Sequence, residues 1–353
     1  MRHAGIRSRI DWQSSAGLLA EQIPRSALHR ESVRWSMGRT RAARGPWTVA
    51  FSGGADSLTL LLLVWAHWPG HRKDLVALHF NHALRGLAAD RDAVFCRQVC
   101  RSLGVAFRSA RWQNRTDPSA SESDARKARF EFFNRVMGPE GRRALWLGHQ
   151  QNDITESMLM RLARGSGLNG LLSPRPIQSL ASGRVHVRPL LSLSKDRILA
   201  HLEKTGIAWR EDASNQLGAH LRNRVRNSVI PSWQATDPTR DLLAGVALAR
   251  ELLEEDAAAL DGWADQTRVQ VNRGLDLDPL RILPKAIIRR ILQKWRLRLG
   301  ARCGDISRQT FEVLLESVIE GRPTRISLGR GGFAVIRGSR LEFDASVSKA
   351  KAR

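Results

Sequence analysis

The stretch Phe51-Ser52-Gly53-Gly54-Ala55-Asp56-Ser57 decides the fold of this chain. It follows the apolar run 47–50, which predicts a buried strand, and precedes the Leu-rich run 58–65, which predicts a helix. A strand, a tight glycine loop and a helix direct backbone N–H groups and a helix N-terminus at one spot, and such a spot binds phosphate. We expect Gly53 and Gly54 to take positive φ and to let an anion approach the backbone closely.

The polar side chains of the loop refine this prediction. Ser52 and Ser57 offer hydroxyl donors. Asp56 by itself would repel a phosphate, so its presence predicts a Mg²⁺ ion between the carboxylate and phosphate oxygens. The competing interpretation is a glycine turn with Asp56 as an ordinary helix cap. No Gly-Lys-Ser or Gly-Lys-Thr follows the glycines, so the loop is not a Walker A loop.

Charge is the strongest bulk property of the chain. Its 353 residues leave room for two or three domains, and their formal net charge is +23. This excess predicts a polyanionic partner, nucleic acid above all, with salt-sensitive binding. The alternative is an Arg-rich surface produced by compositional bias. The sequence has no run of about 18 apolar residues, so we expect no membrane span. Its three cysteines, without a Cys-x-x-Cys pair, fit a protein of the reducing cytoplasm.

The cysteines and the N-terminal residues argue against two kinds of feature, a bound metal centre and a secretory signal. Cys96, Cys100 and Cys303 include no Cys-x-x-Cys pair, so a zinc or iron–sulfur site is not expected. Residues 1–45 are Arg-rich and lack an apolar core segment, which argues against a secretory signal and leaves an organellar transit peptide open.

Strands and helices are predicted to alternate after the loop. Further strands are expected over 75–80, 105–111 and 144–148, and helices over 88–103, 119–136 and 152–164. This alternation predicts an α/β fold, a Rossmann-like parallel sheet with helices on both faces. Ligands of such sheets bind at the carboxyl ends of the strands, so the site should lie just after residues 51, 80, 111 and 148.

Polar residues occur at these strand ends. Asn81-His82-Ala83-Leu84-Arg85 follows the second strand and His149 follows the fourth. Asp153 and Glu156 lie on one face of the next helix, where they could recognise a substrate amine. Each residue alone is more often packed or solvent-exposed. Their joint placement at strand ends predicts a functional site.

Taken together, these stretches resemble the tRNA(Ile)-lysidine synthases, a family of PP-loop ATP pyrophosphatases. The resemblance begins with Ser-Gly-Gly-Ala-Asp-Ser at 52–57 and runs from Trp47 to about Pro231. It continues through the Asn81 stretch, Asp124–Phe133 with Arg126 and Arg129 on one helical face, Arg164–Leu171, Arg188–Leu191, Asp212-Ala213-Ser214-Asn215 and Arg222-Asn223-Arg224-Val225-Arg226.

The segment after the fourth strand departs from the family. Many members read His-His-x-Asp-Asp-Gln-x-Glu-Thr, whereas this chain reads His-Gln-Gln-Asn-Asp-Ile-Thr-Glu-Ser over 149–157. His149, Asp153 and Glu156 keep their spacing, so we expect the acidic pair to keep its role.

The resemblance implies an enzyme, a ligase that forms a carbon–nitrogen bond and converts ATP to AMP and pyrophosphate. It would attach free L-lysine to C2 of the wobble cytidine of a tRNA(Ile) with a CAU anticodon, through an adenylated tRNA. The implied cofactors are ATP and Mg²⁺. A PP-loop enzyme of the 2-thiocytidine type, which needs cysteines that this chain lacks, and a non-catalytic tRNA-binding relative are the alternatives. The oligomeric state stays open, with a dimer as one option.

The implied roles divide the candidate residues into groups. ATP would be bound by Ser52, Gly53, Gly54, Ala55, Asp56 and Ser57, with the metal on Asp56. Catalysis would use Asp56, His149, Arg126 and Arg129, and lysine would be bound by Asp153 and Glu156. Whether His149 orients a phosphate or acts as an acid or base is open. A tRNA-binding or structural role falls to Asn81, His82, Arg85, Arg164, Asp212, Asn215, Arg222, Asn223 and Arg226.

Four regions are expected along the chain. They are a basic N-terminal extension over 1–45, the PP-loop catalytic domain over 46–235, a smaller, mainly helical tRNA-binding domain over 236–345 and a basic tail over 346–353. The third region contains predicted helices at 242–260, 283–299 and 311–319, followed by short strands at 325–328, 333–337 and 340–343.

Overall fold

A computed structural model describes residues 10–83, 87–112, 122–138, 141–180, 182–210, 221–271, 274–300, 303–304, 306–329 and 332–345. Arg85, Asp212 and Asn215 lie outside the described residues. The chain divides into two compact units, Met1–Glu251 (unit 1) and Leu252–Arg353 (unit 2).

The break between the units falls within α12 (Leu242–Gln266), beyond the boundary at 235/236 expected from the sequence. Leu243 packs with Val225 and Ile230, and Val246 packs with Ile154, so the start of α12 belongs to the core of unit 1.

Unit 1 is built around a six-stranded sheet in the order β3-β2-β1-β4-β6-β5. Neighbouring strands are parallel except for β5, which runs antiparallel to β6 at the edge. The chain order reverses between β1 and β4, where ligands of open parallel sheets bind. The strands are β1 (Trp47–Ala50), β2 (Val76–Asn81), β3 (Ala106–Arg111), β4 (Ala144–Trp146), β5 (Ile177–Ser179) and β6 (Val185–Val187).

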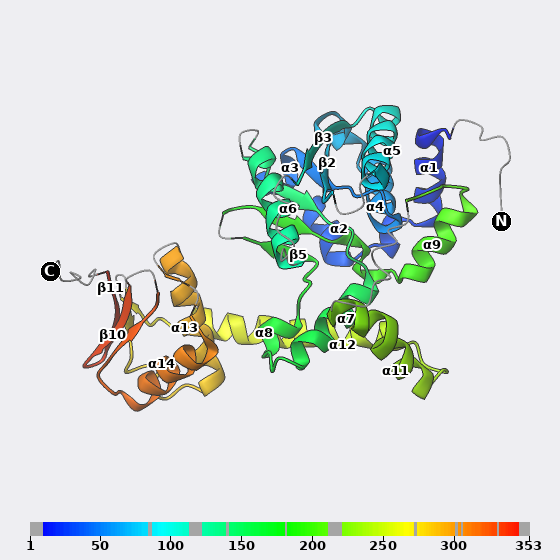
Figure 1. Cartoon of the computed structure of the whole chain (residues 1–353). Helices are drawn as coiled ribbons and strands as arrows, with labels where there is room; N and C mark the ends of the chain where they lie inside the picture. The colour runs from blue at the N-terminus through cyan, green and yellow to red at the C-terminus, as the bar shows by residue number, and fades with distance from the viewer. Residues whose placement is uncertain are drawn as a thin grey trace. The chain divides into compact units, whose positions relative to one another are not determined.

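Helices cover both faces of this sheet, as the sequence predicts (Figure 1). One face packs against α1 (Trp12–Gln22), α4 (Ala55–His67), α5 (Leu87–Leu103) and α9 (Lys195–Lys204), and the other against α6 (Glu122–Met137). Alternate strand residues point to opposite faces, so Val49 and Trp146 face α4 while Leu78 and Leu145 face α6.

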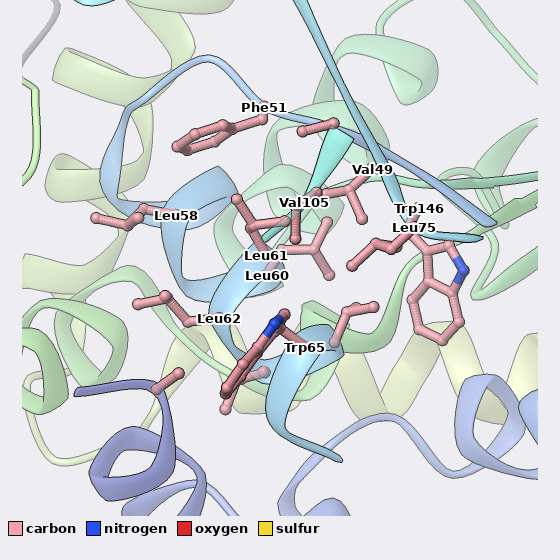
Figure 2. Close-up of a cluster of buried hydrophobic side chains, with 14 of the residues drawn as sticks. Val49, Phe51, Leu58, Leu60, Leu61, Leu62, Trp65, Leu75, Val105 and Trp146 are labelled. Atoms are coloured by element: carbon pink, nitrogen blue, oxygen red, sulfur yellow. The ribbon is translucent and has the colours of Figure 1, made fainter. Parts of the chain in front are cut away.

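The centre of the larger core is α4, which follows the glycine loop. Its leucines are buried because the helix is apolar nearly all round, as expected for a helix in a protein interior. Figure 2 shows Leu58, Leu60 and Leu61 packed near Phe51 and Val49 of the adjoining strand and loop. This packing fixes the N-terminus of α4 against the carboxyl edge of the sheet.

Residues before the first strand are part of this core. Trp12, Ala16, Leu19 and Ile23 follow helical spacing and are buried against α4 and its neighbours. Asp11 caps α1 by accepting hydrogen bonds from two backbone N–H groups. Residues 16–28 do not form one continuous helix, because Pro24 cannot continue α1 and a 3₁₀ turn follows at Arg25–Ala27.

Unit 1 contains further described helices. They are α2 (Arg30–Ser36), α3 (Arg41–Arg44), α7 (Gln151–Leu162), α8 (Leu168–Leu171), α10 (Leu221–Arg224) and α11 (Ile230–Thr236), with a π-helical turn at Val225–Val229 and 3₁₀ turns at Pro69–Asp74 and Pro189–Ser192.

Unit 2 combines helices with a second sheet. Helices α13 (Lys285–Leu299) and α14 (Arg308–Glu320) share a core with five strands in the order β7-β8-β11-β10-β9. The sheet pairs are antiparallel. The strands are β7 (Gln270–Val271), β8 (Gly274–Asp276), β9 (Thr324–Ser327), β10 (Phe333–Arg337) and β11 (Arg340–Asp344), of which the sequence predicted the last three. In the described part of the chain, no helix is long and apolar enough to cross a membrane.

Candidate active site

The two glycines of the PP loop differ in conformation. Gly53 has φ +91°, which favours glycine, and a Cβ there would lie 3.0 Å from Cys96 Sγ. Gly54 has φ −71° and is the N-cap of α4. The expectation of positive φ at both glycines is therefore wrong for Gly54, because α4 begins at Ala55, three residues before the predicted helix start at 58, and Gly54 is its extended N-cap.

The two serines hold the loop closed. Ser57 Oγ donates to the Gly54 carbonyl at 3.0 Å and accepts from the Ser52 backbone N–H at 3.1 Å. The two hydroxyls are 3.0 Å apart. These bonds give the loop a defined shape around the start of α4, so the backbone N–H groups there are preorganised for an anion.

Gly148 brings the end of β4 against the same helix. A Cβ on Gly148 would lie 3.0 Å from the carbonyl oxygen of Asp56 and 3.2 Å from the backbone nitrogen of Ser57. A side chain at this position would therefore push β4 away from α4. The contact places His149, the next residue, at the edge of the sheet beside the PP loop.

Asp56 forms an ion pair that the sequence analysis missed. Lys195 Nζ lies 2.8 Å from Asp56 Oδ1, and the Lys195 backbone N–H donates to Asn152 Oδ1 at 3.0 Å. Burial raises the pKa of Asp56, while Lys195 opposes this rise through its charge and its hydrogen bond. The first residue of α9 thus favours the ionised form of the PP-loop carboxylate.

His149 lies in a strongly cationic environment. Arg188 Nε donates to His149 Nδ1 at 3.1 Å. Burial, followed by the charges of Arg188, Arg222, Arg126 and Arg129, holds the pKa of His149 well below its ordinary value. The imidazole is therefore neutral at physiological pH, and the structure brings three of the predicted catalytic residues, His149, Arg126 and Arg129, together.

Asp153 and Glu156 lie on one face of α7, as their spacing predicts, and both bind the same arginine. Arg222 bridges them, with Nε 2.7 Å from Glu156 Oε2 and Nη2 2.5 Å from Asp153 Oδ1. Arg226 adds a bidentate contact to Glu156, at 2.6 and 3.0 Å. Glu156 is fully buried. Asp153 Oδ2 also accepts from the Gln150 backbone N–H as part of a capping box at the start of α7.

The other predicted residues have separate surroundings. Asn81 accepts from the Ala83 backbone N–H at 2.7 Å and donates to Asp90 at 3.0 Å, so it shapes the turn after β2. His82 packs against Phe80 and Trp112. Arg164 is exposed beyond the end of α7. Asn223 lies on α10 between the arginines that contact the acidic pair.

The metal prediction rests on one carboxylate. Among the described residues no group of three or more His, Cys, Asp and Glu side chains is arranged to hold a metal ion. Asp56 is about one-third exposed, with Oδ1 paired to Lys195. A single accessible carboxylate suits Mg²⁺ that takes its other ligands from water and substrate phosphates.

Two residues missed by the sequence analysis therefore belong to the site, Lys195 and Arg188. Arg188 lay in a motif that had been noted for its resemblance alone, and it follows β6, next to β4 in the sheet. The available signal was a position at the carboxyl end of a strand, but β6 (Val-His-Val) is short and interrupted by a histidine, so its sequence does not indicate a buried strand.

The fold and the site define a PP-loop protein, and comparison with known proteins supports this class. Residues 31–233 match the family model of the PP-loop domain. This match covers more than half of the chain and supports the use of ATP.

Curated relatives are more specific. A tRNA(Ile)-lysidine synthase from Bradyrhizobium sp. is 32% identical over 317 residues, which are 86% of each protein. Those from Geobacter sulfurreducens and Pseudomonas syringae pv. tomato are both 35% identical, over 75% and 78% of this chain. The chain belongs to the tRNA(Ile)-lysidine synthase family. It spans only 56% and 63% of the length of the latter two relatives.

A solved structure is also similar. The U34-tRNA thiolase NcsA from Methanococcus maripaludis, with its [4Fe-4S] cluster, is 19% identical at a TM-score of 0.48, and the match covers 72% of this chain and 86% of that one.

Proposed function

We propose that this chain joins lysine to C2 of the wobble cytidine of a tRNA(Ile) with a CAU anticodon, with ATP converted to AMP and pyrophosphate. One observation carries the proposal. In a chain of this family, the PP loop, the cationic cluster around His149 and a buried acidic pair converge at the carboxyl ends of the central strands β1 and β4. The reaction needs these three elements, for a polyphosphate, its developing charge and an amine.

The first step forms an adenylated tRNA. The C2 carbonyl oxygen of cytidine attacks the α-phosphorus of ATP, and the bond to the β-phosphate oxygen breaks to release pyrophosphate. The N–H groups at the start of α4 and the guanidinium groups of Arg126 and Arg129 favour the charge that develops on phosphate oxygens. Asp56 would hold Mg²⁺, which supplies further charge neutralisation when bound. The cytidine must leave its stack to reach the site, which suits an anticodon loop.

The second step uses the amine of lysine. The ε-nitrogen attacks C2, the C2–O bond breaks, AMP leaves with that oxygen, and the nitrogen loses its surplus protons to solvent. We keep Asp153 and Glu156 as the residues that recognise lysine. Both carboxylates are held by Arg222 and Arg226, and Glu156 is closed to solvent. An ammonium group can reach Glu156 only when one of these arginines moves away.

The direct test supplies ATP, radiolabelled lysine and a tRNA(Ile) transcript with a CAU anticodon. The expected result is label on the tRNA together with pyrophosphate release, and none on a matched transcript with a GAU anticodon. Asp56→Ala should abolish pyrophosphate release while the protein still binds tRNA. A folded wild-type protein that transfers no lysine would refute the proposal.

The same assay separates the alternatives. A non-catalytic tRNA-binding relative would bind the transcript and release no pyrophosphate. A 2-thiocytidine synthetase would release pyrophosphate without needing lysine. Two of the three cysteines, Cys96 and Cys100, are buried, and burial raises the pKa of the Cys100 thiol to about 12. Buried thiols of this kind are poor sulfur carriers. Because tRNA, ATP and lysine meet in the cytoplasm, we place the activity there.

A further inference from the structure

His149 and Arg188 follow two neighbouring parallel strands of the sheet, β4 and β6. Strands β4 and β6 are parallel neighbours in which Trp146 is opposite Val187, and the ladder continues with the Leu147 N–H donating to the Val187 carbonyl. Both residues therefore emerge at the carboxyl edge of the sheet, where the PP loop also lies. Their side chains meet through the 3.1 Å hydrogen bond between Arg188 Nε and His149 Nδ1.

The Arg188 guanidinium is fixed on all sides. Nη1 donates to the Arg175 carbonyl at 2.7 Å and Nη2 donates to Gln178 Oε1 at 3.0 Å. The residue is only 4% exposed. Burial lowers the pKa of Arg188 to about 10, so it remains charged at physiological pH. Three hydrogen bonds in three directions leave Nε pointing at the imidazole.

This contact determines the proton on the imidazole. A guanidinium N–H can only donate, so His149 Nδ1 must accept and carry no proton. In a neutral imidazole the proton is then on Nε2. The charges that act on His149 are those of Arg188 after β6, Arg222 on α10, and Arg126 and Arg129 on α6. The carboxylates tied to this group, Asp153 and Glu156 on α7, pair with Arg222, and Asp153 also acts on Arg188. Each of the four guanidinium groups opposes a second proton on the ring.

We propose that Arg188 is a positioning residue that locks His149 as a neutral imidazole with its proton on Nε2, so that His149 donates a hydrogen bond to an anionic substrate oxygen and does not act as a general base. This answers the choice that the sequence left open for His149. The hydrogen bond from His149 to substrate rests on the proposed function, whereas the tautomer of the imidazole does not.

The tautomer can be observed directly in the full-length protein. Long-range ¹H–¹⁵N correlation spectra of protein with ¹⁵N-labelled imidazoles distinguish the two ring nitrogens, and His149→Gln identifies the His149 signals among the ten histidines. We expect Nε2 to carry the proton from pH 6 to pH 8 without titration. A proton on Nδ1, or an even mixture of tautomers, would overturn the proposal.

Variants of Arg188 test its role. Arg188→Lys keeps a charged donor and should keep the Nε2 proton, whereas Arg188→Met should give a mixture of tautomers. Arg184→Met, an arginine before β6 that contacts Asn134, is the matched control and should leave the His149 signals unchanged. An unmixed Nε2 tautomer in Arg188→Met would contradict the proposal. If Arg188→Met fails to fold, the wild-type and Arg188→Lys spectra still show whether the His149 proton is on Nε2, and a proton on Nδ1 in either would contradict the proposal.

Catalysis gives the second readout. Pyrophosphate release by Arg188→Met should fall in kcat by roughly tenfold to a hundredfold, less than the 10²–10³ typical of deleting a donor outright, because the imidazole is still present. Arg188→Lys should recover part of the loss, and a loss confined to KM would count against a positioning role. Absence of release by the wild type would overturn the proposed function and not the tautomer.

Discussion

Gly53 and Gly54 are neighbours whose backbones impose different demands. An L side chain at φ +91° is strained, and a Cβ on Gly53 meets the buried Cys96 Sγ. We expect Gly53→Ala to lower the free energy of unfolding by about 1–2 kcal/mol. At Gly54 the backbone is already extended and a Cβ would have 3.6 Å or more to its nearest neighbours.

Gly54→Ala is the matched variant for this prediction. Its stability should stay within about 0.5 kcal/mol of wild type, since the reduced entropy of the unfolded chain offsets a poorer helix cap. Urea unfolding of both variants provides the measurement. Equal destabilisation by the two substitutions would show that Gly53 is not the strained position.

The Lys195–Asp56 pair predicts a shift in pH dependence. Burial raises the pKa of Asp56 and Lys195 lowers it, so Lys195→Met should raise this pKa further. Less Asp56 is then ionised at a given pH. The acidic limb of the pH profile for pyrophosphate release should move to higher pH.

Charge-conserving and distant variants test whether this effect belongs to the pair. Lys195→Arg should keep the limb close to its wild-type position. Lys204→Met, at the exposed end of the same helix, should leave it unchanged. A limb that stays in place in Lys195→Met would mean that Asp56 is not the group that titrates there.

At the scale of elements, α7 is joined to α10 and the π-helical turn by buried charges. Glu156 is fully buried and accepts from both Arg222 and Arg226. π-Helical turns are rare and occur often at functional sites. The turn sets the direction of Arg226, so the pairing depends on the helical register of this segment.

Glu156→Gln should therefore destabilise the protein. Breaking one partner of a buried ion pair typically costs 3–5 kcal/mol, and we expect about 2–3 kcal/mol here because both arginines are partly exposed. The urea midpoint should fall with an unchanged m-value. Glu131→Gln, an exposed site on α6, should change stability little. A variant as stable as wild type would show that these charges contribute nothing net.

Local patterns explain which parts of the fold could be predicted. The glycine loop, β1 to β4 and the shared face of Asp153 and Glu156 each follow from a few consecutive residues. The contacts of those residues do not: Arg226 is 70 positions from Glu156, and Lys195 is 139 positions from Asp56. The three residues of β4 are all apolar, whereas the equally short β5 (Ile-Gln-Ser) and β6 (Val-His-Val) contain polar residues, so the strand that precedes Arg188 could not be recognised.

At the scale of the whole molecule, positive charge is present in both units. Unit 1 has 38 Lys and Arg against 21 Asp and Glu, a net +17, and unit 2 has 19 against 13, a net +6. The basic helix α13 in unit 2 is largely neutralised from within, because Arg290 pairs with Asp261, Lys294 with Asp265 and Arg289 with Glu312. We therefore expect unit 1 to contribute more of the electrostatic attraction for tRNA than its catalytic role alone suggests.

Salt dependence tests this distribution. If tRNA binding neutralises six or more phosphates, its affinity should fall on the order of 10³-fold between about 50 and 200 mM salt. Arg164→Gln, at an exposed position of unit 1, should reduce the slope of log Kd against log salt by about one if it contacts a phosphate. Arg289→Gln removes a guanidinium already paired with Glu312 and should leave the slope unchanged. The reverse result, a smaller slope only for Arg289→Gln, would place the principal RNA contacts on α13 despite its internal ion pairs.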